Sequence, residues 1–312
     1  MDVARGTAYV AVSVATVWTD GSSPRPQDAA GLGNPVDVPG WLAATSADRE
    51  GLMSGGLTQT QALYGDEVEI VGGKGGWCEV AVPGQASRKD DRGYPGWIPA
   101  AQLVTGPAFG ELRATVPFAQ VDRARTTVLY QDRRLSSALL RISAGTRLPV
   151  LAEDGPAVQV ATPCGGSGWL PAGAVTVRRS VDDIPRPSGV DLVATAALFL
   201  GLPYLWAGRS GLAVDCSGLT SLVHHIHGIP LPRDADDQHL HPAGRDVDAT
   251  AGLEPGDLLF YTDDRDGASR AIDHVSMYAG DRRMIEARNG RHARVTEVRT
   301  EFLAGGRRFA VS

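Results

Sequence analysis

Residues 214–219 are Val-Asp-Cys-Ser-Gly-Leu, and they open the segment that decides the fold of the C-terminal part of the chain. The apolar residues of this segment have the i, i+3, i+4, i+7 spacing of one helix face: Leu219, Leu222, Val223 and Ile226. Gly228 follows as a natural helix stop. The pattern predicts an amphipathic helix with Cys216 in its first turn. The positive end of a helix favours the nucleophilic thiolate, so Cys216 is a candidate nucleophile.

A cysteine nucleophile needs a base, and that base needs a third group to orient it. His274 begins a predicted strand at 274–279, after a charged turn at 263–270. Glu286 lies in the next predicted strand, and it would stand beside His274 if the two strands form a hairpin. Its carboxylate would then hold the imidazole in the correct tautomer. Other histidines lie on the Cys216 helix or in a Pro-flanked loop: His224, His225, His227, His239 and His241.

The three helical histidines also raise the question of a metal site. His224, His225 and His227 would spread over more than half of the helix surface, whereas zinc needs ligands that converge from one side. We therefore expect a solvated helix face, no metal site and no cofactor.

The first half of the chain predicts β-structure with an internal repeat. Residues 96–99 (Gly-Trp-Ile-Pro) recur as 168–171 (Gly-Trp-Leu-Pro), each after an alternating strand. A repeated unit of this kind predicts two small barrels of about five strands each, the first with an insertion at about 20–60 that contains a short helix near 38–47. The alternative is two unrelated β-domains that share these residues by coincidence.

The composition changes after a proline-rich, charged stretch. A helix predicted at 190–200 and strands predicted at 257–261, 274–279 and 283–287 have the order of an α+β domain. The sequence therefore predicts a multidomain β plus α+β protein. Its expected parts are a first barrel with a helical insertion, a second barrel, a linker and a third domain, at 1–105, 106–178, 179–189 and 190–312.

Composition excludes several classes of partner. The net charge of −6 argues against nucleic acid and anionic membranes, and no stretch approaches 18 uninterrupted apolar residues. Three dispersed cysteines imply no disulfide framework. The apolar run at 9–14 resembles a strand more than a signal peptide. We expect a cytoplasmic monomer, or a secreted protein if the native N-terminus was trimmed.

Three motifs together resemble the NlpC family of cysteine peptidases: Asp-Cys-Ser-Gly-Leu at 215–219, Pro-Gly-Asp-Leu-Leu-Phe at 255–260 and Asp-His-Val-Ser-Met-Tyr at 273–278. The two barrels in front resemble bacterial SH3-like (SH3b) domains. The chain is similar to the γ-D-glutamyl-L-diamino-acid endopeptidase branch, which cleaves between D-Glu and the diamino acid of murein peptides. The resemblance implies two SH3-like β-barrels followed by a papain-like α+β cysteine peptidase domain.

The resemblance also implies catalytic roles. Cys216 would attack the γ-D-Glu carbonyl, His274 would act as base, and Tyr204 would line the oxyanion side. Glu286 occupies the third position, where the family usually has His, so this part of the site departs from the family pattern.

Further positions are implied to bind the substrate. Asp215 and Ser217 would help to bind D-Glu. Arg233-Asp234-Ala235 matches an Arg-Asp-Ser segment that closes the pocket, with Asp234 pairing the free amine of the substrate. Ala235 in place of Ser removes one hydrogen bond.

The first barrel would close the far end of the groove. Tyr94 matches a family tyrosine at that position, and Glu67 or Asp66 would add negative charge. The enzyme would then act on murein tripeptides or tetrapeptides with a free N-terminal L-Ala, in cell-wall peptide recycling. The alternatives are a catalytically weak or inactive wall-peptide-binding protein, and a papain-like amidase or acyltransferase with another substrate.

Overall fold

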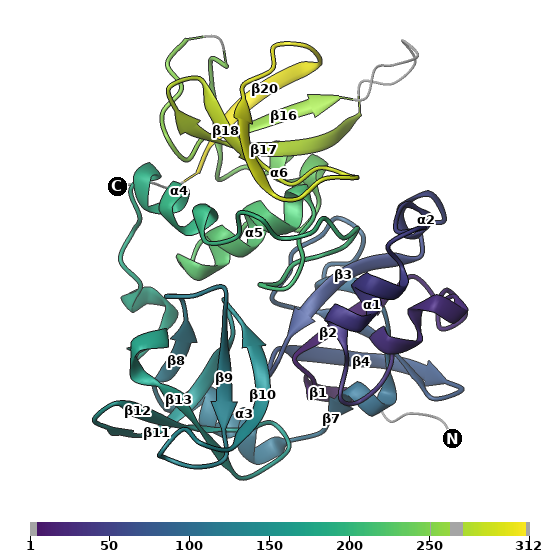
Figure 1. The fold of residues 1–312 in the computed structure, drawn as a ribbon, viewed down its shortest axis with the longest axis vertical. Coiled ribbons are helices and arrows are strands. Elements are labelled where there is room, and N and C mark those ends of the chain that lie inside the picture. The colour runs from purple at the N-terminus through teal and green to yellow at the C-terminus, as the bar shows by residue number, and fades with distance from the viewer. Residues whose placement is uncertain (1–4, 250, 263–270, 310–312) are drawn as a thin grey trace.

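The computed structural model describes residues 5–249, 251–262 and 271–309, and its described strands form three sheets. In Figure 1 the two N-terminal sheets lie below the third, with helix α5 between the layers. The expected charged turn at 263–270 lies outside the described residues. None of the helices in the described ranges is long and apolar enough to cross a membrane.

The first sheet is an SH3-like barrel of seven strands, where the sequence predicted about five, with the strand order β3-β2-β6-β5-β4-β1-β7. Its strands are β1 Gly6–Val10, β2 Val14–Trp18, β3 Thr58–Leu63, β4 Glu67–Lys74, β5 Trp77–Val82, β6 Tyr94–Pro99 and β7 Leu103–Val104. The expected insertion lies between β2 and β3 and holds η1 Pro26–Gly31, α1 Val38–Ala44 and α2 Glu50–Ser54. Trp41 of this insertion is fully buried and packs against Trp18 of the barrel.

The second sheet repeats the first, with the order β10-β9-β13-β12-β11-β8-β14, so each strand number is shifted by seven. Its strands are β8 Phe118–Val121, β9 Thr126–Tyr130, β10 Ala138–Ser143, β11 Arg147–Asp154, β12 Ala157–Ala161, β13 Ser167–Pro171 and β14 Val175–Arg178. The two Gly-Trp copies lie in β6 and β13, each followed by a 3-10 turn, η2 Ala100–Gln102 or η3 Ala172–Ala174. Helix α3 Pro107–Thr115 joins the barrels. The internal repeat that the sequence predicted therefore corresponds to two sheets with the same strand topology.

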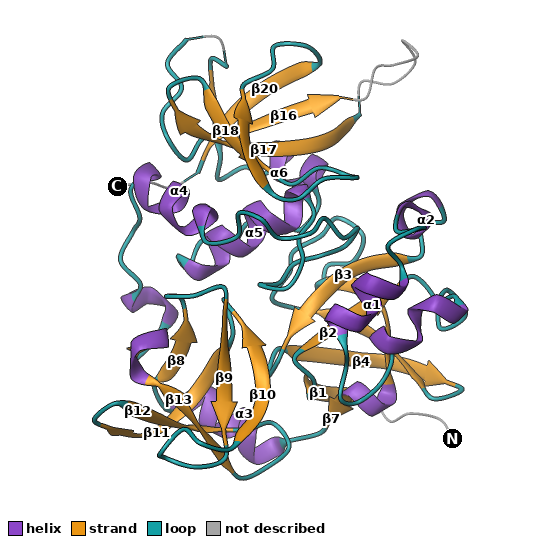
Figure 2. Cartoon of the chain, in the orientation of Figure 1, coloured by secondary structure: helices purple, strands orange, loops and turns teal. Residues whose placement is uncertain are grey.

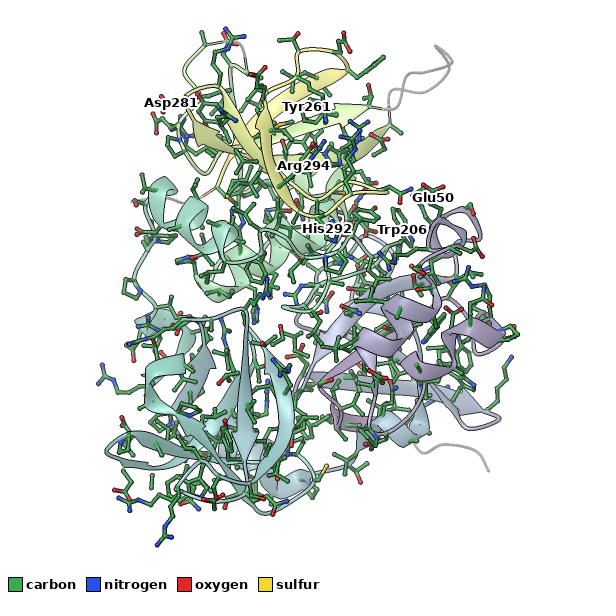
Figure 3. The ribbon with its side chains drawn as sticks, viewed as in Figure 1. Glu50, Trp206, Tyr261, Asp281, His292 and Arg294 are labelled. Carbon is green, nitrogen blue, oxygen red and sulfur yellow. The ribbon has the colours of Figure 1, made fainter. Side chains whose placement is uncertain are left out.

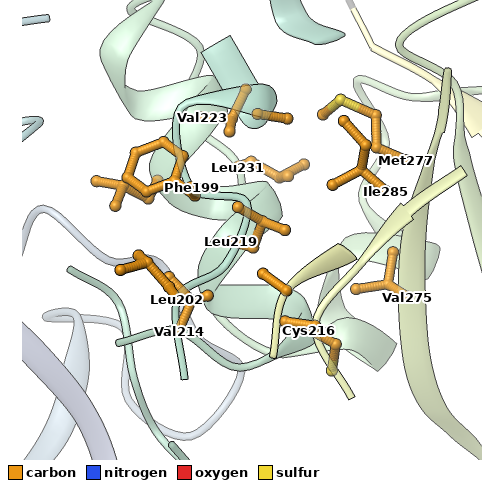
Figure 4. Close-up of a cluster of buried hydrophobic side chains, with 14 of the residues drawn as sticks. Phe199, Leu202, Val214, Cys216, Leu219, Val223, Leu231, Val275, Met277 and Ile285 are labelled. Atoms are coloured by element: carbon orange, nitrogen blue, oxygen red, sulfur yellow. The ribbon is translucent and has the colours of Figure 1, made fainter. Parts of the chain in front are cut away.

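The third domain packs helices against an antiparallel sheet with the order β15-β20-β16-β17-β18-β19 (Figure 2). After the turn η4 Val181–Asp183, its helices are α4 Gly189–Ala197, α5 Cys216–Ile226 and α6 Ala235–Leu240. Its strands are β15 Arg245–Val247, β16 Leu258–Thr262, β17 Ile272–Gly280, β18 Arg283–Glu286, β19 Arg294–Glu297 and β20 Leu303–Arg308. Figure 4 shows Leu219 and Val223 of α5 in one apolar cluster with Val275 and Met277 of β17, and Cys216 at its edge.

Helix α5 is covered on nearly every side, so the expected solvated histidine face was wrong. His224 is fully buried, and its Nδ1 lies 2.8 Å from the carbonyl oxygen of Thr220. His225 and His227 are half-buried and contact the Gly145 carbonyl and the Thr195 hydroxyl. The expected loop around His239 is also wrong, because this residue lies in α6. The reason in both cases is tertiary packing, which local sequence does not encode.

The second barrel supports the C-terminal end of α5, where helix carbonyl groups lack partners within the helix. Gln120 on β8 donates to the Ile226 carbonyl at 2.8 Å, and Arg147 on β11 donates to the His225 carbonyl at 2.6 Å. Gln120 is itself held by Arg147 Nε at 2.7 Å. These bonds fix the helix that carries Cys216 to the second barrel.

Replacing Gln120 by alanine leaves the buried Ile226 carbonyl without its donor, so Gln120→Ala should lower the free energy of unfolding by about 1–3 kcal/mol. Thermal or urea unfolding of the full chain measures the loss. Gln159→Ala is the matched control, because the Gln159 amide bonds Ser167 at the surface. Equal losses in the two variants would contradict a structural role for the Gln120 contact.

Candidate active site

Cys216 begins helix α5 because Asp215 caps it. The Asp215 Oδ1 atom accepts a hydrogen bond from the Gly218 backbone N–H at 2.6 Å, and Oδ2 accepts one from Ala207 at 2.8 Å. A β-carbon on Gly218 would lie 1.9 Å from the Gly208 carbonyl oxygen, so only glycine permits this close approach. The helix start therefore presents Cys216 at a position set by backbone packing.

His274 and Glu286 meet in the β17–β18 hairpin, as the sequence predicted. His274 Nε2 lies 3.0 Å from Glu286 Oε2. Burial lowers the pKa of His274, but hydrogen bonds to Cys216 and Glu286 raise it, and the net pKa is about 9 against an ordinary 6.5. The imidazolium is therefore the favoured form at neutral pH, which suits a thiolate–imidazolium pair.

Glu286 is almost fully buried, and its charge is shared with cations as well as with His274. Burial raises its pKa, whereas the His274 hydrogen bond and nearby arginines lower it, to a net value of about 2. Arg299 Nη1 lies 3.1 Å from Glu286 Oε2, and Arg294 Nη2 lies 3.8 Å from Oε1. The carboxylate stays ionised and can orient the imidazole ring. The arginine contacts were not foreseen, because they come from β19 and the turn after it.

Arg233 joins the active site to the first barrel. Its buried guanidinium bonds Asp215 Oδ2 at 2.6 Å, Ser217 Oγ at 2.8 Å and Thr60 Oγ1 on β3 at 2.9 Å. Its backbone N–H donates to the Ala86 carbonyl in the β5–β6 loop at 3.2 Å. The polar atoms of Asp215 are thus largely occupied by the protein itself, so this residue positions the helix start.

Tyr94 of the first barrel lies directly over Asp234 of the third domain. The buried phenol Oη donates to both Asp234 carboxylate oxygens, at 2.8 and 2.9 Å. Lys89 Nζ lies 3.0 Å from Asp234 Oδ2, donates to Tyr94 Oη and sits 4.4 Å from its ring centroid. Burial, followed by the Asp234 charge, raises the pKa of Tyr94, so the phenol remains a donor. No sequence motif indicated Lys89 as a site residue.

A groove of about 810 Å³ passes over Cys216, and most of the predicted site residues line it: Tyr94, Tyr204, Asp215, Cys216, Ser217, Arg233, Asp234 and His274. Burial and the Cys216 charge raise the pKa of Tyr204, so its hydroxyl stays protonated near the sulfur. Glu286 and Glu67 are the exceptions. Glu286 is buried and contacts His274. Glu67 is exposed at the start of β4 and lines other depressions, because the barrel turns this strand away from Cys216.

Family profiles and known relatives match both the third domain and the barrels. The NlpC/P60 family profile matches residues 201–305, and a YKFC SH3b2 domain profile matches 123–177. The chain is 39% identical over 308 residues to a gamma-D-glutamyl-L-lysine dipeptidyl-peptidase of Bacillus cereus, covering 97% of this chain and 90% of that protein. The chain belongs to the NlpC/P60 family. A Bacillus subtilis protein of the same name is 34% identical over 277 residues, covering 88% of each.

The fold agrees with this assignment. The crystal structure of an NlpC/P60 family protein from Bacillus cereus superimposes with a TM-score of 0.90 at 39% identity, covering 97% of this chain and 99% of that one. The chain is therefore an NlpC/P60 cysteine peptidase with two N-terminal SH3-like domains. In the described ranges, no group of three or more His, Cys, Asp or Glu side chains could hold a metal ion.

The His274–Glu286 contact predicts a pH dependence. Because the His274 pKa is raised to about 9, the imidazolium persists well above the ordinary pKa of 6.5 and is lost as pH rises through about 9. Glu286→Gln removes the carboxylate, so the alkaline limb of kcat/KM should move toward lower pH. Activity should fall on the order of 10–100-fold as the ring loses its orientation.

A pH–rate profile with a murein tripeptide measures both effects. Glu297→Gln, an exposed carboxylate on β19, is the matched control and should keep the profile of the wild type. An unchanged alkaline limb in Glu286→Gln would contradict the orienting role.

Proposed function

We propose that this chain hydrolyses the γ-D-glutamyl–diamino acid bond of murein tripeptides or tetrapeptides that have a free N-terminal L-Ala. The observation that carries the proposal is the contact of Tyr94 and Lys89 with Asp234 at one end of the groove. Lys89 holds the Asp234 carboxylate in the structure, so a substrate ammonium would take the place of Lys89 there, with the barrel wall beyond it. A peptide whose L-Ala is still joined to glycan would meet that wall.

The mechanism is acyl transfer. The Cys216 thiolate attacks the γ-carbonyl carbon, and the C–N bond breaks as the His274 imidazolium protonates the leaving amine. His274 then takes a proton from water, which attacks the thioester and releases L-Ala-D-Glu. The Cys216 backbone N–H and the Tyr204 hydroxyl are the proposed oxyanion donors, and Ser217 and Arg233 face the D-Glu.

A restriction to free amines fits a role in recycling, since the substrate must already have been released from glycan by an amidase. We place this role in the cytoplasm and expect a monomer to carry it out. The three free thiols are consistent with a reducing compartment.

The first experiment is mass spectrometry of L-Ala-γ-D-Glu-diaminopimelate and its N-acetyl form, each incubated with the protein. Wild type should release L-Ala-D-Glu from the free peptide alone, and Cys216→Ala should release none. Cleavage of both peptides would reject the amine requirement. Cleavage of neither would reject this substrate and favour a wall-peptide-binding protein or an enzyme for another acyl substrate.

The amine site makes a second prediction. Asp234→Asn keeps the side-chain shape but removes the charge, so KM for the free peptide should rise about 10–100-fold, with a smaller change in kcat. Steady-state kinetics measures both constants. Asp246→Asn is the control, because this exposed carboxylate pairs with Arg307 away from the groove. An unchanged KM in Asp234→Asn would remove Asp234 from the amine site.

A further inference from the structure

Two arginines line the leaving-group side of the groove, whose full lining also includes the acidic residues Asp273 and Glu301. If the acyl part of the substrate lies toward Asp234, the diamino acid lies on the opposite side of Cys216, next to the His274 that protonates its amine. On this side of Cys216, His274 is hydrogen-bonded to Glu286, and Glu286 forms an ion pair with Arg299. Arg288, Asn289 and Arg299 line this part of the groove.

A second depression of about 570 Å³ adjoins the groove here and shares these three residues with it. Its remaining lining residues are Glu50, Arg291 and Arg294, so four arginines face one carboxylate. Glu50 comes from α2 in the insertion of the first barrel, and its Oε1 accepts a hydrogen bond from Asn289 at 3.2 Å. Figure 3 shows Glu50 beside the segment of the third domain that carries His292 and Arg294.

The positive charge in this depression is only partly neutralised. Arg294 and Arg299 share Glu286, which His274 also uses, and Arg294 Nε is buried without a hydrogen-bond partner among the described atoms. Neither Arg288 nor Arg291 has an acidic side chain within 4.0 Å in the described part of the chain. Such an arrangement has hydrogen-bond donors available for a carboxylate.

We propose that this depression binds the side-chain end of the leaving diamino acid and selects one that carries a carboxylate there, as diaminopimelate does. That end of diaminopimelate has an ammonium and a carboxylate on one carbon, which match Glu50 and the arginines. Lysine ends in an ammonium alone, which could meet Glu50 but would leave the arginines without an anionic partner. The inference rests on the proposed function, because that function sets which side the diamino acid occupies.

The test compares kcat/KM for three tripeptides that share L-Ala-γ-D-Glu and end in meso-diaminopimelate, in its side-chain amide, or in L-lysine. The diaminopimelate peptide should be preferred about tenfold over each of the others, as expected for a few partly exposed charge-assisted bonds. The amidated peptide isolates the carboxylate, since it keeps the length and the ammonium. The preference should shrink in 0.5 M salt.

Arg288→Gln and Arg291→Gln should each reduce the ratio between the diaminopimelate and amidated peptides. Both side chains are exposed, so the folds should survive, which thermal unfolding checks. Arg141→Gln, on the exposed face of β10 in the second barrel, is the matched control and should leave the ratio unchanged.

The outcomes distinguish a failure of the proposed selectivity from a failure of the proposed peptidase function. Equal kcat/KM values for the three peptides, or a ratio unaffected by both arginine substitutions, would overturn the selectivity and leave the proposed peptidase function intact. Preference for the lysine peptide would also overturn it. Cleavage of none of the three would reject the proposed function itself, and the selectivity with it.

Discussion

The buried Arg233–Asp215 pair is the interaction on which the rest of the site depends. Asp215 caps the helix that presents Cys216, and Arg233 holds that carboxylate while bonding Thr60 of the first barrel. Removing one partner of such a pair leaves an uncompensated buried charge, which costs about 3–5 kcal/mol. The position of the nucleophile is therefore coupled to the docking of the first barrel.

The first barrel also contributes residues to the groove and to the depression beside it. Tyr94 and Lys89 contact Asp234 in the groove, and Glu50 of the insertion lines the adjoining depression together with four arginines. The second barrel acts differently, since Gln120 and Arg147 hold the far end of α5. One barrel thus lines the groove over Cys216, and the other supports the helix that carries Cys216.

Local sequence patterns predicted the helices and strands well, but they did not predict which charged side chains contact the site. The stripe after Cys216 predicted α5, and the Gly-Trp repeat predicted two barrels, which the structure shows to share one strand order. The His274–Glu286 contact followed from a hairpin between neighbouring strands. Lys89, Arg299 and the burial of His224 depend on contacts between distant segments, which no local period encodes. Glu67 was misplaced for the same reason.

A crystal structure of the Cys216→Ala variant with L-Ala-γ-D-Glu-diaminopimelate bound would show directly which way the substrate lies in the groove. We expect the peptide ammonium between Asp234 and Tyr94, with Lys89 moved away from the carboxylate, and the γ-carbonyl carbon over position 216. A peptide bound in the reverse direction, or one whose amine points to open solvent, would contradict the assignment of the two ends of the groove.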